Sequence, residues 1–174
     1  MDAARSRAAR AADYSCSIWN PQLQTTPRRS RRLPVVRQWI FAAVCAGAVA
    51  TTSPARADGA GYSQRLAALV NQYRAEHGRA ALRIDDTLTR LALDHSAAMA
   101  KAGRMNHDGF ETRARQSGFA MCIENVGWNY RSPDAQLDGW RASPGHDRNM
   151  LDAHVERIGV AELGGYVTLL ACGH

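Results

Sequence analysis

The chain has 174 residues, and its 22 Lys and Arg against 16 Asp and Glu give a formal net charge of +6. This charge is unevenly distributed, because residues 1–57 carry +7 whereas residues 58–174 carry −1. The larger part therefore lacks the basic excess that nucleic-acid binding requires, and we exclude that class of function.

The N-terminal 57 residues have the order of a secretory signal. Arginines cluster between residues 28 and 37, an apolar run covers about 39–50, and Ala55-Arg56-Ala57 follows. This order predicts cleavage after Ala57 and an exported domain over residues 58–174. The apolar run is shorter than the roughly 20 residues that span a bilayer, which disfavours a retained anchor. We expect a secreted or periplasmic protein that is not an integral membrane protein once processed.

Two details of this segment leave alternatives open. Ser30-Arg31-Arg32 is compatible with twin-arginine export, but Pro34 fits that pattern poorly, so the general secretory route is preferred. Residues 1–27 show no globular pattern and are either a long extension of the signal or an untranslated stretch upstream of the true start.

The next two elements are predicted to be helices. Ser63 can cap a helix over 63–77, in which Leu66, Leu69, Val70 and Tyr73 form an apolar stripe before Gly78. After an extended piece at 80–84, Asp85 or Asp86 can cap a second helix that runs to about Ala102 and ends at Gly103. His95 lies on the apolar face of this helix, and we interpret it as a hydrogen-bonded core residue.

A buried carboxylate is predicted further along the chain. His107 lies in a loop, a short helix follows at about 110–116, and an apolar strand at 119–128 contains Glu124 and Asn125. A carboxylate in such a strand is costly unless it is paired. This conflict between pattern and burial is typical of a functional site.

The last third of the chain predicts two short helices and a hairpin. Ser132-Pro133 and Ser143-Pro144 each place a cap before a proline, and His146 falls in the first turn of the second helix, where the helix dipole favours a neutral imidazole. Strands at 155–163 and 166–172 flank Gly164-Gly165. The element order predicts an α+β domain with helices packed on a small antiparallel sheet.

Residues 58–174 contain two cysteines, Cys122 and Cys172. In an oxidising compartment a disulfide between them is the default expectation, and it would fix the wall beside Glu124. Two buried free thiols are the alternative.

A set of short motifs resembles the bacterial branch of the CAP superfamily, which groups cysteine-rich secretory proteins, antigen-five allergens and pathogenesis-related group 1 proteins. The motifs are Asn71-x-x-Arg74, Leu82-x-x-Asp85, Leu91-Ala92-x-x-His95-Ser96-x-x-Met99-Ala100, Asn106-His107, Glu124-Asn125, Trp140, Ser143-Pro144-Gly145-His146-x-x-Asn149-x-Leu151 and Ile158-Gly159-Val160. The resemblance implies an α-β-α sandwich, secretion, and a cleft with two histidines and two acidic residues.

Carried onto this chain, the resemblance assigns His107, Glu124 and His146 to the cleft. Two positions depart from the family pattern: Ile123 replaces a glycine, and Ser143 stands in place of the second glutamate. The resemblance therefore implies a triad, with Ser143 and Asn125 as auxiliary residues.

Four hypotheses for the cleft remain open at this stage. His107, Glu124 and His146 form the ligand set of an open zinc or other divalent-metal site. The same groups would suit a hydrolase of peptides or esters. The hypothesis we prefer is a binding module without turnover, which would recognise an extracytoplasmic protein, a lipid or sterol, or a cell-envelope ligand, with the loop Trp128–Arg131 either at the interface or simply packed. Finally, the triad would serve only as a structural network. No nucleotide cofactor is expected.

Overall fold

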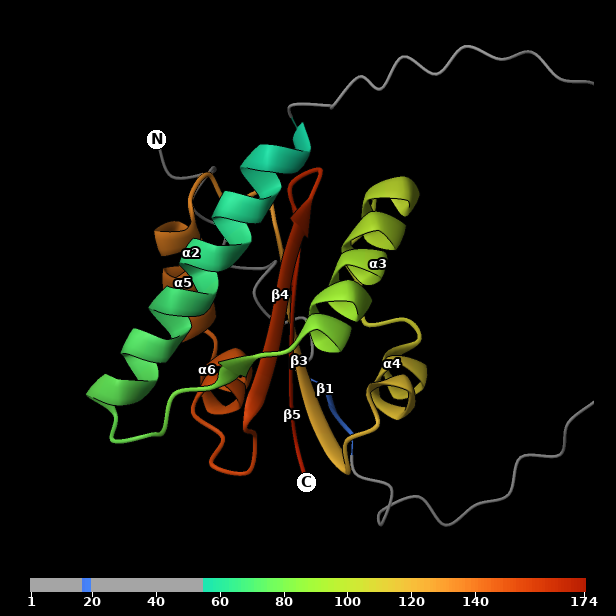
Figure 1. The fold of residues 1–174 in the computed structure, drawn as a ribbon. Coiled ribbons are helices and arrows are strands. Elements are labelled where there is room, and N and C mark those ends of the chain that lie inside the picture. Colours follow the sequence, from blue (N-terminus) through green and yellow to red (C-terminus); the bar gives the residue numbers. More distant parts are fainter. Residues whose placement is uncertain (1–16, 20–54) are drawn as a thin grey trace, which may run out of the picture.

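The computed structural model describes residues 17–19 and 55–174, and it places one sheet between two layers of helices (Figure 1). The elements in chain order are β1 (Ser17–Trp19), α2 (Ala55–Glu76), β2 (Arg83–Ile84), α3 (Asp86–Ala102), α4 (Phe110–Ser117), β3 (Met121–Trp128), α5 (Pro133–Arg141), α6 (Pro144–Met150), β4 (Arg157–Leu163) and β5 (Tyr166–Gly173). This is the α+β domain that the element order predicted, in the α-β-α sandwich that the family resemblance implied.

The sheet has the strand order β1-β3-β5-β4-β2, so the C-terminal strand is central. β5 is buried along its whole length, and its residues alternate between the two faces, as the period of a strand requires. The pairs β1–β3, β3–β5 and β4–β5 are antiparallel, but β2 runs parallel to β4. The sheet is therefore mixed rather than wholly antiparallel, and the long connection from β2 to β4, which contains α3, permits the parallel pairing that a hairpin would not.

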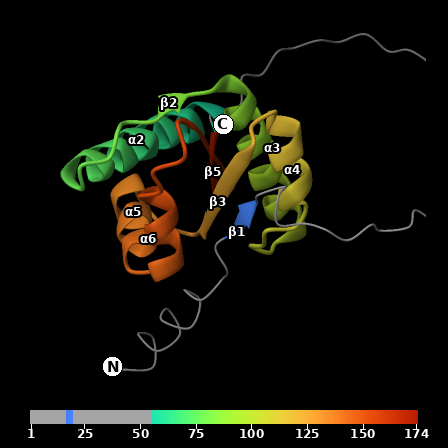
Figure 2. The ribbon, with the colours of Figure 1, turned by 90° about the horizontal axis from the view of Figure 1, so that it is seen from below.

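The two faces of the sheet carry different helices. Helices α2, α5 and α6 cover one face, and α3 and α4 cover the other (Figures 1 and 2). The first face holds the larger core, in which Leu66 and Val70 of α2 meet Trp140 of α5 and Leu169 of β5. A second core joins α3 and α4 to the opposite face of β5 through residues such as Leu88, Phe110 and Leu170.

The predicted caps of α3 and α5 and the predicted hairpin turn are present, whereas Ser143 holds the N-cap position of α6 without a side-chain cap hydrogen bond. The side chain of Asp85 accepts the Leu88 N–H, and Gly103 ends α3 in the left-handed conformation at φ 62°. Ser132 caps α5 in the same manner. Gly164 and Gly165, at φ 63° and 83°, form the tight turn of the final hairpin. Within the described residues, no helix combines the length and apolar character needed to cross a bilayer.

Two features near the N-terminus differ from the predictions. α2 begins at Ala55, eight residues before Ser63, and the Ser63 hydroxyl donates to the Gly59 carbonyl inside the helix at 2.7 Å. The predicted cleavage site after Ala57 thus lies in the first turn of α2. In addition, Ser17–Trp19 form a strand, although residues 1–27 show no globular pattern. The basic cluster at 28–37 and the apolar run at 39–50 lie outside the described residues.

Candidate functional site

Glu124 is fully buried in β3, and both of its carboxylate oxygens have partners. Arg113 of α4 donates from Nε to Oε2 and from Nη2 to Oε1, each at 2.8 Å. His107 Nδ1 lies 2.8 Å from the same Oε1. The buried carboxylate is therefore paired, as the sequence predicted. A bidentate arginine–carboxylate pair is among the strongest hydrogen-bonded ion pairs in proteins.

Arg113 is the member of the site that the sequence interpretation missed. It also donates from Nη1 to the carbonyl of Asp108 at 2.7 Å, so it connects the His107 loop to β3. The signal was available, since Phe110, Arg113 and Ala114 are the buried residues of α4 and have the spacing of one helix face. An arginine on an inward face requires an acidic partner, and Glu124 was the buried acid without one.

The Glu124 carboxylate fixes how His107 presents its ring. An ionised carboxylate can only accept, so Nδ1 carries the proton and donates. The second ring nitrogen, Nε2, is buried and has no hydrogen-bond partner among the described residues. His107 therefore offers one lone pair to a ligand, metal or proton.

His95 is a hydrogen-bonded core residue, as predicted, and it lies next to this group. Its Nε2 lies 2.9 Å from the carbonyl of Asn106, in the His107 loop, and 3.9 Å from Oε1 of Glu124. Burial lowers the pKa of His95, so the imidazole is neutral and is no ion-pair partner of the carboxylate. His95 supports the loop.

His146 lies on α6, against the other face of the sheet from Arg113. Its Nε2 is also buried without a partner in the described part of the chain, and its ring lies 6.4 Å from that of Trp140. The pKa of His146 is lowered to about 4, mainly by burial and secondly by the electrostatic influence of the neighbouring His107. The imidazole is thus neutral, as predicted, but the main cause is loss of solvent rather than the helix dipole.

Two asparagines hold α6 against β3. Asn125 donates to the backbone carbonyl of His146 at 3.0 Å, and Asn149 donates to the Asn125 side chain at 2.9 Å and to the Glu124 carbonyl at 3.2 Å. Glu124 and Asn125 are adjacent and point to opposite faces of the sheet. β3 thus brings the two histidine segments together across its edge. Ser143 is buried at the start of α6.

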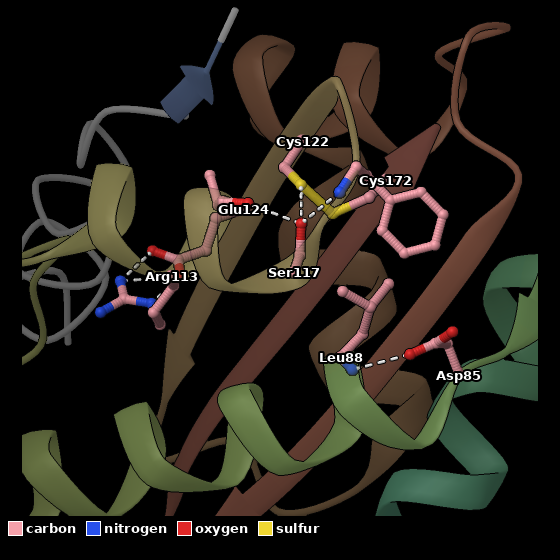
Figure 3. The surroundings of a disulfide bond; sticks show 9 residues. Asp85, Leu88, Arg113, Ser117, Cys122, Glu124 and Cys172 are labelled. Atoms are coloured by element: carbon pink, nitrogen blue, oxygen red, sulfur yellow. Dashed lines mark hydrogen bonds and ion pairs between the residues drawn. A yellow bond between two sulfur atoms is a disulfide. The ribbon is translucent and has the colours of Figure 1, made fainter. Parts of the chain in front are cut away.

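The predicted disulfide between Cys122 and Cys172 is present (Figure 3). The two residues are directly opposite each other on β3 and β5. The Ser117 hydroxyl, at the end of α4, lies 3.3 Å from the Cys122 sulfur and donates to the carbonyl of Ala114. The bridge therefore fixes β3 two residues before Glu124.

The donor set fits a divalent metal only in part. The Nε2 atoms of His107 and His146 are buried donors without partners, which is the state that a metal would satisfy. The oxygens of Glu124 are already engaged by Arg113 and His107. Within residues 17–19 and 55–174, no three His, Cys, Asp or Glu side chains form a group able to hold a metal ion.

The loop after β3 exposes aromatic surface. Trp128 is 53% exposed, although its ring stacks on Tyr166 with a centroid separation of 6.0 Å. Tyr130 is 39% exposed and also packs against Gly139 of α5. Both rings pack against the domain on one side and are exposed on the other, which is compatible with both interpretations of this loop.

Comparison with known proteins places these observations in a family. The sequence profile of the cysteine-rich secretory protein family, CAP, matches residues 67–164. The uncharacterized protein YkwD of Bacillus subtilis is 27% identical over 124 residues, which cover 67% of this chain and 47% of that protein. The chain spans less than half the length of the two Bacillus subtilis relatives that it matches.

Solved structures show the same fold at low sequence identity. An extracellular protein containing a SCP domain from Bacillus anthracis matches with a TM-score of 0.67 and 24% identity, over 74% of this chain and 45% of that one. An outer surface protein from Borrelia burgdorferi matches with a TM-score of 0.59 and 19% identity, over 64% of this chain and 91% of that one.

Proposed function

The chain belongs to the cysteine-rich secretory protein family, and we propose that it is an exported binding module whose cleft is built on His107, Glu124 and His146. The observation that carries this proposal is the pair of buried imidazoles whose Nε2 atoms lack partners among the described residues. A purely structural network would satisfy its own polar groups. The Nε2 lone pairs of His107 and His146 are both without a partner in the part of the chain that the structure describes, and the two residues lie on segments held against opposite faces of β3. We infer that these lone pairs receive a ligand.

Export is supported by the signal-like order of the first 57 residues and by two structural neighbours, one an extracellular protein and one an outer surface protein. We propose that residues 58–174 are the functional domain. Cleavage after Ala57 would remove three residues of α2 and leave the apolar stripe from Leu66 onwards. N-terminal sequencing of the exported protein tests this boundary.

For a divalent metal, zinc above all, we propose His107 and His146 as the protein ligands. Glu124 would act from behind His107, since a carboxylate that accepts from Nδ1 fixes the tautomer and strengthens the imidazole as a ligand. Arg113 would hold that carboxylate in place. A bound zinc ion would supply a Lewis acid.

We favour binding over turnover because the acid of the site is fixed. A general base must be free to exchange a proton, and Glu124 is fully buried under two hydrogen bonds from Arg113. Hydrolysis of a peptide or ester by His146 or a metal-bound water is the alternative. The half-exposed Trp128, at the end of the strand that carries the site, is our candidate contact for an extracytoplasmic protein, lipid or envelope ligand.

Zinc binding to the full chain tests the site. Calorimetry at neutral pH should show one site that is lost in His107→Ala and in His146→Ala. His154→Ala is the matched control, since the His154 side chain is 80% exposed and its ring contacts Asp152. Zinc at 100 times its Kd should stabilise the wild type by about 2.7 kcal/mol in thermal unfolding.

Two results would contradict the proposal. One is wild-type behaviour of both cleft variants in calorimetry and unfolding. The other is turnover of a broad ester and peptide panel that disappears in His146→Ala, which would establish the hydrolase instead.

A further inference from the structure

The outer edge of β3 includes Glu124, the residue that binds His107. The Asn129 N–H donates to the Gly165 carbonyl on the β5 side, at 2.8 Å. In an antiparallel pair, alternate residues direct their backbone groups to the same side. The backbone groups of Cys122, Glu124 and Val126 therefore point away from β5, toward the outer edge of β3.

Side chains from the helices cover part of this edge. Trp140 donates from Nε1 to the Val126 carbonyl at 2.9 Å, and Asn149 donates to the Glu124 carbonyl at 3.2 Å. Proteins commonly cover exposed strand edges in this way, because unpaired backbone groups recruit other strands. Near the start of β3, the outer edge is instead paired with another strand.

That strand is β1, which comes from the N-terminal segment. It pairs with β3 in antiparallel register, with Ser17 opposite Glu124 and Trp19 opposite Cys122, two of the residues whose backbone groups face outward. Figure 2 shows β1 alongside β3, with α6 on one side and α4 on the other. Glu124, the partner of Ser17 in this register, binds His107, and the adjacent Asn125 binds the His146 carbonyl.

We propose that the outer edge of β3 at Cys122–Glu124 is a strand-docking site for an extended peptide. In the unprocessed chain, residues 17–19 occupy it. After the expected cleavage at Ala57, the same edge takes a peptide from another protein. Recognition is through backbone hydrogen bonds, so the occupant must have free N–H groups at alternate positions and no proline there. This inference rests on the proposed binding role of the cleft and names its ligand class.

Amide hydrogen exchange of the full chain tests the pairing. In the variant Ser17→Pro/Trp19→Pro, the N–H groups that face β3 are removed, and the Cys122 and Glu124 amides should exchange roughly tenfold faster or more. Ile18→Pro is the matched control, because the Ile18 N–H points away from β3 and proline is tolerated there on an edge strand. Its Cys122 and Glu124 amides should stay protected.

Adding a partner strand in trans tests the docking. A synthetic peptide of residues 13–20, with Cys16→Ser, should restore protection of the Cys122 and Glu124 amides in Ser17→Pro/Trp19→Pro. The same peptide N-methylated at residues 17 and 19 should not. Unchanged exchange in the double proline variant, or equal protection by the two peptides, would overturn the proposal. Zinc titration of the same samples measures the histidine site independently of strand docking. Loss of the docking proposal can therefore be distinguished from loss of the proposed metal site.

Discussion

The guanidinium of Arg113 and the carboxylate of Glu124 form two hydrogen bonds of 2.8 Å in the interior of the protein, one to each oxygen. Glu124 has no exposed surface. This pair converts an acid that could have been a ligand or a base into a fixed acceptor for His107. The chemistry of the site consequently depends on Arg113, which binds both Glu124 and the carbonyl of Asp108 in the His107 loop.

Replacing Arg113 by Ala should destabilise the protein by about 3–5 kcal/mol, because it leaves a buried carboxylate without its counter-charge. Denaturant unfolding at neutral pH measures this change. Arg115→Ala on the same helix is the control, since the Arg115 side chain is 56% exposed and its ion pair with Glu111 spans 3.9 Å. That variant should change stability by less than about 1 kcal/mol. Equal effects of the two substitutions would contradict the assignment.

His146 should make the protein less stable as the medium is acidified. Its folded-state pKa is lowered to about 4, whereas an unfolded histidine has a pKa of about 6.5. Between these values the unfolded chain binds a proton that the folded chain does not, so stability rises with pH. The contribution is fully present above about pH 6.5 and is lost as the pH falls toward 4, by about 3 kcal/mol in total.

Urea unfolding between pH 7 and pH 4.5 measures this dependence, with His146→Gln as the comparison. The variant lacks the titrating group, so its stability should fall less steeply than that of the wild type. Curves that run parallel over this range would show that His146 is not the group responsible.

The sequence was sufficient for elements with local signals. α3 has its aspartate cap, apolar stripe and terminal glycine within 19 residues, and its boundaries follow from them. The hairpin follows from Gly164-Gly165 between two apolar runs. These signals involve residues that are close in the chain, so no knowledge of the fold is needed to interpret them.

The remaining features depend on contacts between distant segments. The parallel pairing of β2 with β4 joins Ile84 to Ile158, and the Arg113–Glu124 pair joins α4 to β3. β1 is held by backbone pairing with β3, and backbone bonds leave no composition signal in residues 17–19. The early start of α2 was not predictable because Ser63 has the chemistry of a cap, yet here it bonds within the helix and accepts the Glu162 N–H.

Gly159 permits α3 to pack directly on β4, and its replacement should be destabilising. A Cβ at this position would lie 2.1 Å from the backbone carbonyl carbon of Leu88. Backbone cannot move aside as a side chain can, so Gly159→Ala should cost about 1–3 kcal/mol or more.

Gly61→Ala is the control, since a methyl group there would have no described atom within 4 Å and α2 is helical at this point. That substitution should stabilise by about 0.4–1 kcal/mol. Thermal unfolding compares both, and a neutral Gly159→Ala would contradict the close packing.

Removal of the Cys122–Cys172 bridge should cost about 4 kcal/mol on the chain-entropy estimate for its separation of 50 residues. Because the bridge joins directly opposed residues of β3 and β5, its loss frees the unfolded chain without opening the native pairing. The variant Cys122→Ala/Cys172→Ala should therefore remain folded but unfold at lower denaturant. Reducing agent should destabilise the wild type by a similar amount and leave the double variant unchanged. If reduction instead affects both proteins equally, the stabilisation does not come from this bridge.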